Sequence, residues 1–137
     1  MNKQYEIIYY DYSIRTNFVA TAQSTSSTSY VDLATVGPSI TFATGTTVMI
    51  TLTSTISNGS STSGISYMSI DVSGSTIIAA ADENALIVET NTSSSITQLS
   101  ATFVLTVSAG SNTFTAKYKA GSNTSTFSNR RMIIQNI

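Results

Sequence analysis

The chain has 137 residues, contains no cysteine or histidine, and carries six basic and seven acidic residues for a net charge of −1. This length is typical of one domain. The absence of cysteine excludes a disulfide scaffold. It also leaves the chain without thiolate and imidazole groups, the usual nucleophiles, general bases and zinc ligands of proteins.

The charges are unevenly spread along the chain. Residues 1–89 hold seven acidic and two basic residues, whereas residues 90–137 hold four basic residues and no acid. We expect the two halves to interleave in one domain, so that these charges pair across it. Four basic residues and a pI near 5.0 do not form the dense basic patch of a nucleic-acid-binding protein.

Neither a membrane span nor a secretion signal is predicted. No stretch approaches the ~20 consecutive apolar residues of a membrane span. Glu6 and Asp11 interrupt the first residues, which are therefore unlike a signal peptide. We expect synthesis in the cytoplasm without export.

Serine and threonine together make 47 of the 137 residues. Threonine favours strands through its branched Cβ, and serine favours turns together with glycine and asparagine. Glutamate, lysine and leucine, the good helix formers, are scarce. The composition therefore predicts an all-β protein with a neutral surface rich in hydroxyl groups.

Residues 1–29 are predicted to lie outside this domain, as an aromatic arm up to residue 22 and a Ser/Thr-rich linker from residue 21. Four of the seven tyrosines fall in the first twelve residues, and tyrosine is enriched at protein interfaces. The alternative is that this segment is a first strand of the domain. As an arm, its partner-binding residues would be Tyr5, Ile7, Ile8, Tyr9, Tyr10, Tyr12, Ile14 and Phe18.

Residues 30–137 are predicted to form one antiparallel β-sandwich of about eight strands, of jelly-roll or immunoglobulin-like type. Apolar and polar residues alternate along most of the expected strands, as in strands with one buried face. Thr51, Thr53 and Thr55 would lie on a solvent face. A helical turn is expected near residues 79–86. The expected strands are 30–33, 39–42, 48–56, 66–73, 87–89, 96–107, 113–119 and 126–137.

The last two strands are predicted to pair as a hairpin around the polar turn at residues 120–124. Lys117 and Lys119 would share its solvent face. Arg130 and Arg131 are adjacent, so a regular strand would point them to opposite faces. We predict that one of them is substantially buried and is bonded either to a carboxylate, such as Asp32 or Asp71, or to backbone carbonyls.

No constellation of residues predicts catalysis, a metal site or a cofactor. Lys117 and Lys119 have no particular serine as a partner among twenty-four. Asp82 and Glu83 are adjacent, so their side chains diverge and do not form the facing pair that glycosidases use. Asp82, Glu83 and Asn84 offer oxygen ligands but lack the spacing of a calcium loop.

Several segments give the chain a family resemblance. They are 30–41, 46–52, 72–76, 110–118 and 126–134, and the most distinctive pieces are Asn112-Thr-Phe-Thr-Ala-Lys-Tyr118 and Phe127-Ser-Asn-Arg-Arg131. In these segments the chain resembles small β-sandwich proteins of tailed-bacteriophage virions. The resemblance covers residues 30–137 and implies capsid decoration or cement subunits, or modules of head and tail fibres. It implies no catalytic residues.

The sequence therefore predicts a non-enzymatic virion protein that decorates the outer capsid surface and braces major capsid subunits. Its partners would be the major capsid protein or other virion proteins, with self-association also open, and no nucleic acid or membrane. The alternative is a head- or tail-fibre module that binds host glycans through loops 57–64 and 121–125. The location would be the capsid surface, after synthesis in the host cytoplasm.

Overall fold

The structure is a computed structural model that describes residues 3–4 and 14–137. Among these residues, no helix is long and apolar enough to cross a membrane. One 3-10 turn, η1, spans Asp82–Asn84. The described strands are β1 (Ile14–Val19), β2 (Gln23–Thr25), β3 (Ser39–Thr44), β4 (Thr47–Asn58), β5 (Gly64–Gly74), β6 (Leu86–Thr90), β7 (Ile96–Thr106), β8 (Gly110–Ala120) and β9 (Ser125–Asn136).

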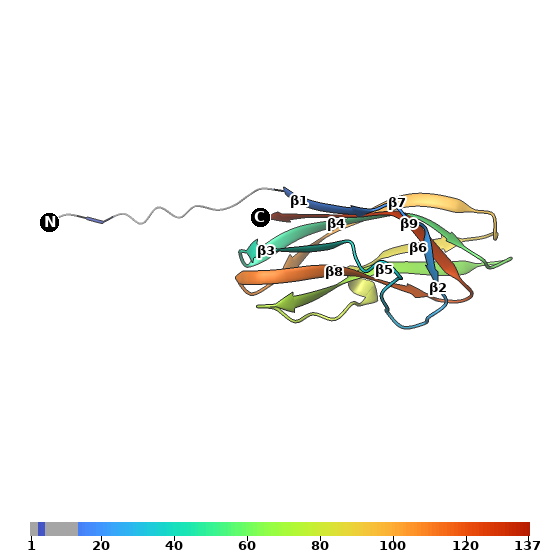
Figure 1. Ribbon diagram of the computed structural model, residues 1–137, viewed down its shortest axis with the longest axis horizontal. Coiled ribbons are helices and arrows are strands. Elements are labelled where there is room, and N and C mark those ends of the chain that lie inside the picture. The colour runs from blue at the N-terminus through green and yellow to red at the C-terminus, as the bar shows by residue number, and fades with distance from the viewer. Residues whose placement is uncertain (1–2, 5–13) are drawn as a thin grey trace.

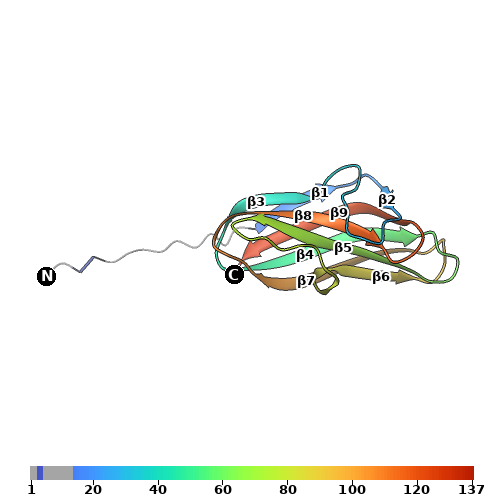
Figure 2. The same cartoon turned by 90° about the horizontal axis from the view of Figure 1, so that it is seen from below.

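The strands form two antiparallel sheets that pack face to face as a sandwich (Figures 1 and 2). One sheet has the order β1–β9–β4–β7, with the short strand β2 also paired to β9. The other has the order β3–β8–β5–β6. The predicted all-β sandwich is confirmed.

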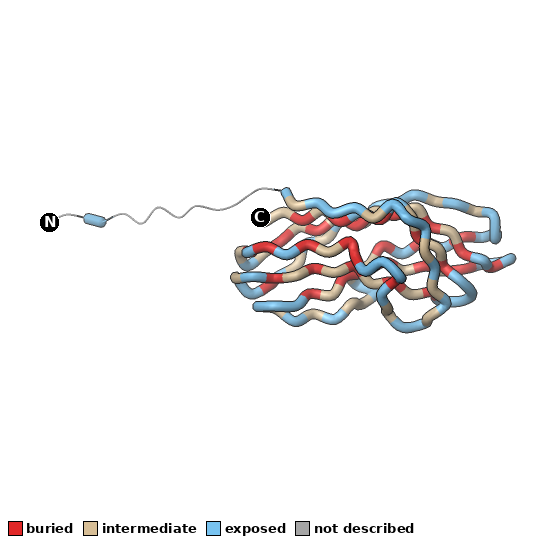
Figure 3. The backbone as a smooth tube through the Cα atoms, viewed as in Figure 1, coloured by how far each residue is buried: buried red, intermediate tan, exposed pale blue. Residues whose placement is uncertain are grey.

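The core lies between the sheets and is built from alternate residues of the long strands (Figure 3). Along β4, every second residue from Val48 to Ile56 is fully buried, Ser54 included, while the residues that alternate with them are half-buried. The rings of Tyr118 on β8 and Phe127 on β9 meet across the core at 4.8 Å between centroids. The alternation in the sequence thus reports directly which side chains face the opposite sheet.

The sandwich begins earlier than the boundary at Tyr30 that the sequence predicts. β1 pairs with β9 from Ile14 to Val19, and β2 pairs with β9 within the expected Ser/Thr linker. The inward positions of β1 include Arg15 and Asn17, which close one side of the sandwich. Asn17 donates to the Ser39 carbonyl at 3.0 Å, and the Arg15 guanidinium lies over the Phe42 ring. Polar inward residues hide the usual strand pattern.

The prediction of a hairpin between the last two strands is wrong. β8 and β9 belong to different sheets, so the turn at residues 121–124 carries the chain across the sandwich. Each strand does bury one face, as predicted, but they bury those faces against each other. Alternation cannot distinguish two strands paired in one sheet from two strands packed across a core. Likewise, the strand expected at 30–33 is a single bridge between Val31 and Tyr118.

Candidate functional site: the open face of the β1–β9–β4–β7 sheet

The outer surface of the β1–β9–β4–β7 sheet is formed by three rows of residues, each of which crosses all four strands. The pairing register aligns Ile14, Gln135, Met49 and Val104 in the first row, Thr16, Ile133, Thr51 and Thr102 in the second, and Phe18, Arg131, Thr53 and Ser100 in the third. We call these twelve residues the open face. All are exposed or half-buried, so no described segment covers them.

Hydroxyl groups on the open face bond to each other across the strands. The Thr51 and Thr102 hydroxyls are 2.8 Å apart, as are those of Thr53 and Ser100. These side chains are therefore held in fixed positions beside apolar ones, with Ile14 61% exposed and Val104 58% exposed. The result is an ordered surface with both hydrogen-bonding and apolar character.

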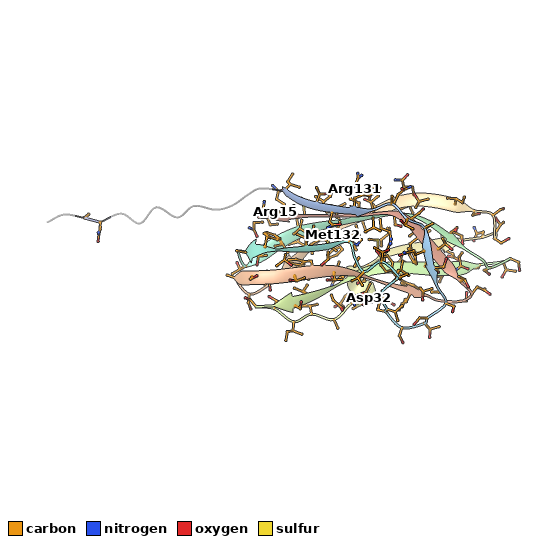
Figure 4. All side chains as sticks on the ribbon, in the orientation of Figure 1. Arg15, Asp32, Arg131 and Met132 are labelled. Carbon is orange, nitrogen blue, oxygen red and sulfur yellow. The ribbon has the colours of Figure 1, made fainter. Side chains whose placement is uncertain are left out.

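Arg131 is the only charged residue among the twelve. Its guanidinium lies 4.9 Å from the centroid of the exposed Phe18 ring, which holds the arginine over the aromatic face. Figure 4 shows Arg131 on the outer side of its sheet, whereas the next residue, Met132, lies between the two sheets.

Two of the residues that the sequence predicts as partner-binding, Ile14 and Phe18, lie on this open face. The other six, Tyr5, Ile7, Ile8, Tyr9, Tyr10 and Tyr12, lie outside the described residues. Sequence reasoning did not select Met49, Val104 and Ile133, the apolar residues of the remaining strands. Each of them lies at an outward position of a strand in which apolar and polar residues alternate. An apolar residue at such a position is the sequence feature that could have indicated a binding surface.

The outer surface of the opposite sheet is organised by ion pairs. The Lys117 ammonium lies 2.7 Å from a carboxylate oxygen of Asp32, on the segment beside β8, and 3.6 Å from one of Asp71 on β5. Burial alone would lower the pKa of Lys117, but the hydrogen bond and charge of Asp32, helped by Asp71, raise it above its usual value. We call this surface the ion-paired face.

Lys119 joins two segments on the ion-paired face. Its ammonium lies 2.6 Å from Asp82 and 4.8 and 4.3 Å from the ring centroids of Tyr30 and Tyr67. The Tyr30 hydroxyl also donates to Asp82 at 2.8 Å. Burial and the Asp82 bond raise the pKa of Tyr30, while the bonds from Lys119 and Tyr30 hold the pKa of Asp82 below its usual value.

A hollow of about 410 Å³ lies beside this network, lined by residues that include Asp71, Ser73, Thr115, Lys117 and Ile77. The charged groups in its wall already bond to each other. Among the described residues, no three acidic, histidine or cysteine side chains gather as a metal site.

Arg130 is the buried member of the arginine pair, and it has no exposed surface. It donates to the carbonyls of Thr35 at 3.3 Å and Gly37 at 3.1 Å, and to the side-chain oxygen of Gln23 at 2.8 Å. The prediction of one buried arginine bonded to backbone carbonyls is confirmed, and within residues 3–4 and 14–137 no carboxylate, the alternative partner, bonds to it. Asp32 and Asp71 pair with Lys117 instead.

A bulge in β9 produces this orientation. The register with β4 shifts between Thr53 and Thr55, and Asn129 adopts a left-handed φ of 48°. Phe127 is buried before the bulge and Arg130 is buried after it. Because the bulge adds one residue to β9, Arg130 takes an inward position and Arg131 an outward one. Gly37, which accepts from both Arg130 and the Tyr118 hydroxyl, also has positive φ, a conformation that favours glycine.

The two loops proposed for glycan binding adjoin at one end of the sandwich. The Asn58 side-chain amide donates to the Ser122 carbonyl at 3.0 Å, and the Gly59 amide donates to the Thr124 carbonyl at 2.9 Å. Asn58 itself is buried, so it anchors the loops and does not offer a ligand-binding group.

Comparison with known proteins does not assign the chain to a family. No protein-family model and no curated protein sequence matches it. Among solved structures, a family two carbohydrate esterase from Cellvibrio japonicus is similar over 91% of this chain and 34% of its own, so this chain spans about a third of that one. The identity is 14% and the TM-score is 0.30, values too low to support an inference about function.

Proposed function

We propose that this chain is a non-enzymatic structural protein of a tailed-bacteriophage virion, a decoration or cement protein that binds the outer capsid surface and bridges neighbouring major capsid subunits. The observation that carries the proposal is the open face, a four-strand surface of fixed hydroxyl, apolar and arginine side chains that no described segment covers. The sequence resemblance supplies the virion context.

The size of this sheet fits a protein partner. The 11- and 12-residue strands β9, β4 and β7 cover about 14 Å by 37 Å, and the six-residue strand β1 adds about 5 Å by 20 Å, which together give roughly 630 Å². A standard protein interface buries about 800 Å² on each partner. Arginine and aromatic residues dominate binding energy at such interfaces, so Arg131 and Phe18 are the expected centre of affinity.

A cement protein binds the assembled shell and not the unfolded coat protein, so it stabilises the shell by mass action. The test is cosedimentation of the chain with particles of the phage that encodes it, after removal of the native copies. The double variant Arg131→Glu/Thr53→Glu should bind at least ~100-fold more weakly, because it buries two acids against the partner. The matched control Ser73→Glu/Thr41→Glu, on the opposite sheet, should bind like the wild type.

Equal binding by both double variants would contradict docking through the open face. The copy number of the chain in purified particles, measured by quantitative mass spectrometry, provides a second criterion. We expect one copy, or one small oligomer, per repeating site of the capsid lattice. A few copies per particle would contradict the decoration role.

The second candidate is a head- or tail-fibre module that recognises host glycans. It is favoured by the contact between loops 57–64 and 121–125, which places serine, threonine and asparagine side chains from both loops at one end of the sandwich. A glycan array separates the two functions. Saturable binding that is lost when Ser122 and Thr124 are replaced by alanine would support the fibre module.

A further inference from the structure

Strand β7 is the least protected edge of the two described sheets. Its outer edge has no strand partner, it is 11 residues long, and Ile96-Thr-Gln-Leu-Ser-Ala-Thr-Phe-Val-Leu-Thr106 contains neither a charge nor proline. The other edges are shorter or interrupted. β6 has five residues and includes Glu89, β3 has six residues after Pro38, and β1 carries Arg15. Charges, proline and short length are the usual protection against edge pairing.

Both sides of this edge are also apolar. On the inward side, Leu99 is 46% exposed, and Phe103 and Leu105 are only partly buried against the core. On the outward side, Ile96 and Val104 are exposed. A strand added beside β7 would satisfy its free backbone groups and cover these side chains, so the edge fits an extended, apolar segment.

We propose that β7 accepts residues 5–13 of a neighbouring copy of this chain as an additional strand. The segment Tyr-Glu-Ile-Ile-Tyr-Tyr-Asp-Tyr-Ser is rich in tyrosine and isoleucine, which are strong strand formers. Its nine residues reach roughly 30 Å when extended, which matches most of the length of β7. As a strand it would place apolar residues on both of its faces. These would match the apolar residues on the two sides of the β7 edge.

The position of the segment in the chain selects a neighbour as the acceptor. Residues 5–13 end directly at Ile14, where β1 begins, and β1 and β7 lie at opposite edges of the sheet. A strand beyond the chain's own β7 would be about 19 Å away, which takes about six extended residues to cross. Too few residues would then remain to pair. A neighbouring copy imposes no such crossing.

Each copy would donate one strand and accept another through different surfaces. Such a head-to-tail contact closes into a ring or continues as a chain of copies. The inference goes beyond the proposed docking of the open face. It concerns contacts between copies of this chain and is tested without particles.

The chain contains no cysteine, so two single-cysteine variants can report the contact. Full-length Tyr9→Cys and Ser100→Cys chains carrying different tags are mixed and treated with a short bis-maleimide. We expect the mixed cross-linked dimer to be the main product, at least tenfold more abundant than from Tyr9→Cys mixed with the control Thr41→Cys on β3. The cross-link should disappear when a peptide of residues 1–13 is added in excess.

Analytical ultracentrifugation of the uncross-linked protein gives an independent result. Wild-type chain should associate with rising concentration, and Thr102→Lys on β7 should weaken association at least tenfold while Thr41→Lys leaves it unchanged. The proposal is overturned if the wild type stays monomeric at all concentrations, or if Tyr9→Cys links equally to β3. Preferential linkage between two Ser100→Cys chains would overturn it too, because it would indicate pairing between two β7 edges.

Discussion

The two outer faces of the sandwich use their polar residues in opposite ways. On the ion-paired face, Lys117 and Lys119 bond to acids from flanking segments, and the rings of Tyr30 and Tyr67 enclose Lys119. On the open face, the hydroxyl pairs Thr51–Thr102 and Thr53–Ser100 lie within the same sheet, and Arg131 is the one charge among twelve residues. One face is tied to flanking segments, while no described segment covers the other, which is the surface proposed to bind a partner.

This difference shows how the uneven charge distribution is resolved. Acids from the first 89 residues and lysines from β8 neutralise each other on one surface, as expected from the interleaving of the two halves. The arginines of β9 are separated by the bulge at Asn129, so one is buried and the other faces outward. Substitutions on the two faces should therefore affect different properties.

The largest expected effect comes from the arginine pair, which tests whether the open face contributes to stability. Arg130→Ala should lower the free energy of unfolding by about 3 kcal/mol or more, because it opens a cavity and leaves the Thr35 carbonyl without its partner. Arg131→Ala should change it by less than about 0.5 kcal/mol. Urea unfolding followed by tyrosine fluorescence gives both values. Similar losses in the two variants would refute the separation of roles.

A smaller effect is expected on the ion-paired face. The variant Lys117→Met/Lys119→Met should lose about 1–2 kcal/mol of stability, since partly exposed ion pairs contribute little each and the contacts to two rings add to them. Its control is Thr51→Val/Thr102→Val on the open face, which removes the bonded hydroxyl pair at nearly constant volume. We expect less than about 0.5 kcal/mol there. A larger loss on the open face would invert the comparison.

The smallest effect is the pH dependence of the ion-paired face. The pKa of Asp82 is lowered in the folded chain, so its contribution is present above the unfolded value of about 3.9 and declines as the pH falls below it. The pKa values of Lys117 and Tyr30 are raised, so their contributions are lost above about pH 10. Burial raises the pKa of Tyr118 to about 12, which acts in the same direction.

The urea midpoint should therefore stay level between about pH 5 and pH 9 and fall on both sides. In Lys117→Met/Lys119→Met/Asp82→Asn the acidic decline should be weaker than in the wild type. The open-face variant Arg131→Ala should keep the wild-type profile. An identical acidic decline in the triple variant would remove the role assigned to this network.

Period-two alternation predicted β4, β5, β7 and β8 and the buried phase of each, because these strands place most of their apolar residues on one side. It failed for β1, where Arg15 and Asn17 occupy the inward phase, and for the partner of β9, because alternation carries no information about which strand is adjacent. The bulge at Asn129 was not visible either. The open face depends on all three of these features, so only Ile14 and Phe18 among its twelve residues were predicted as partner-binding.

The proposed function requires that the open face, and not the ion-paired face, is covered when the chain binds a particle. Single cysteines at Thr53 and at Ser73 can be labelled with maleimide on the free chain and on the chain bound to particles. We predict that binding slows labelling at position 53 at least tenfold and leaves position 73 unchanged. Protection at position 73 with free labelling at position 53 would contradict the account.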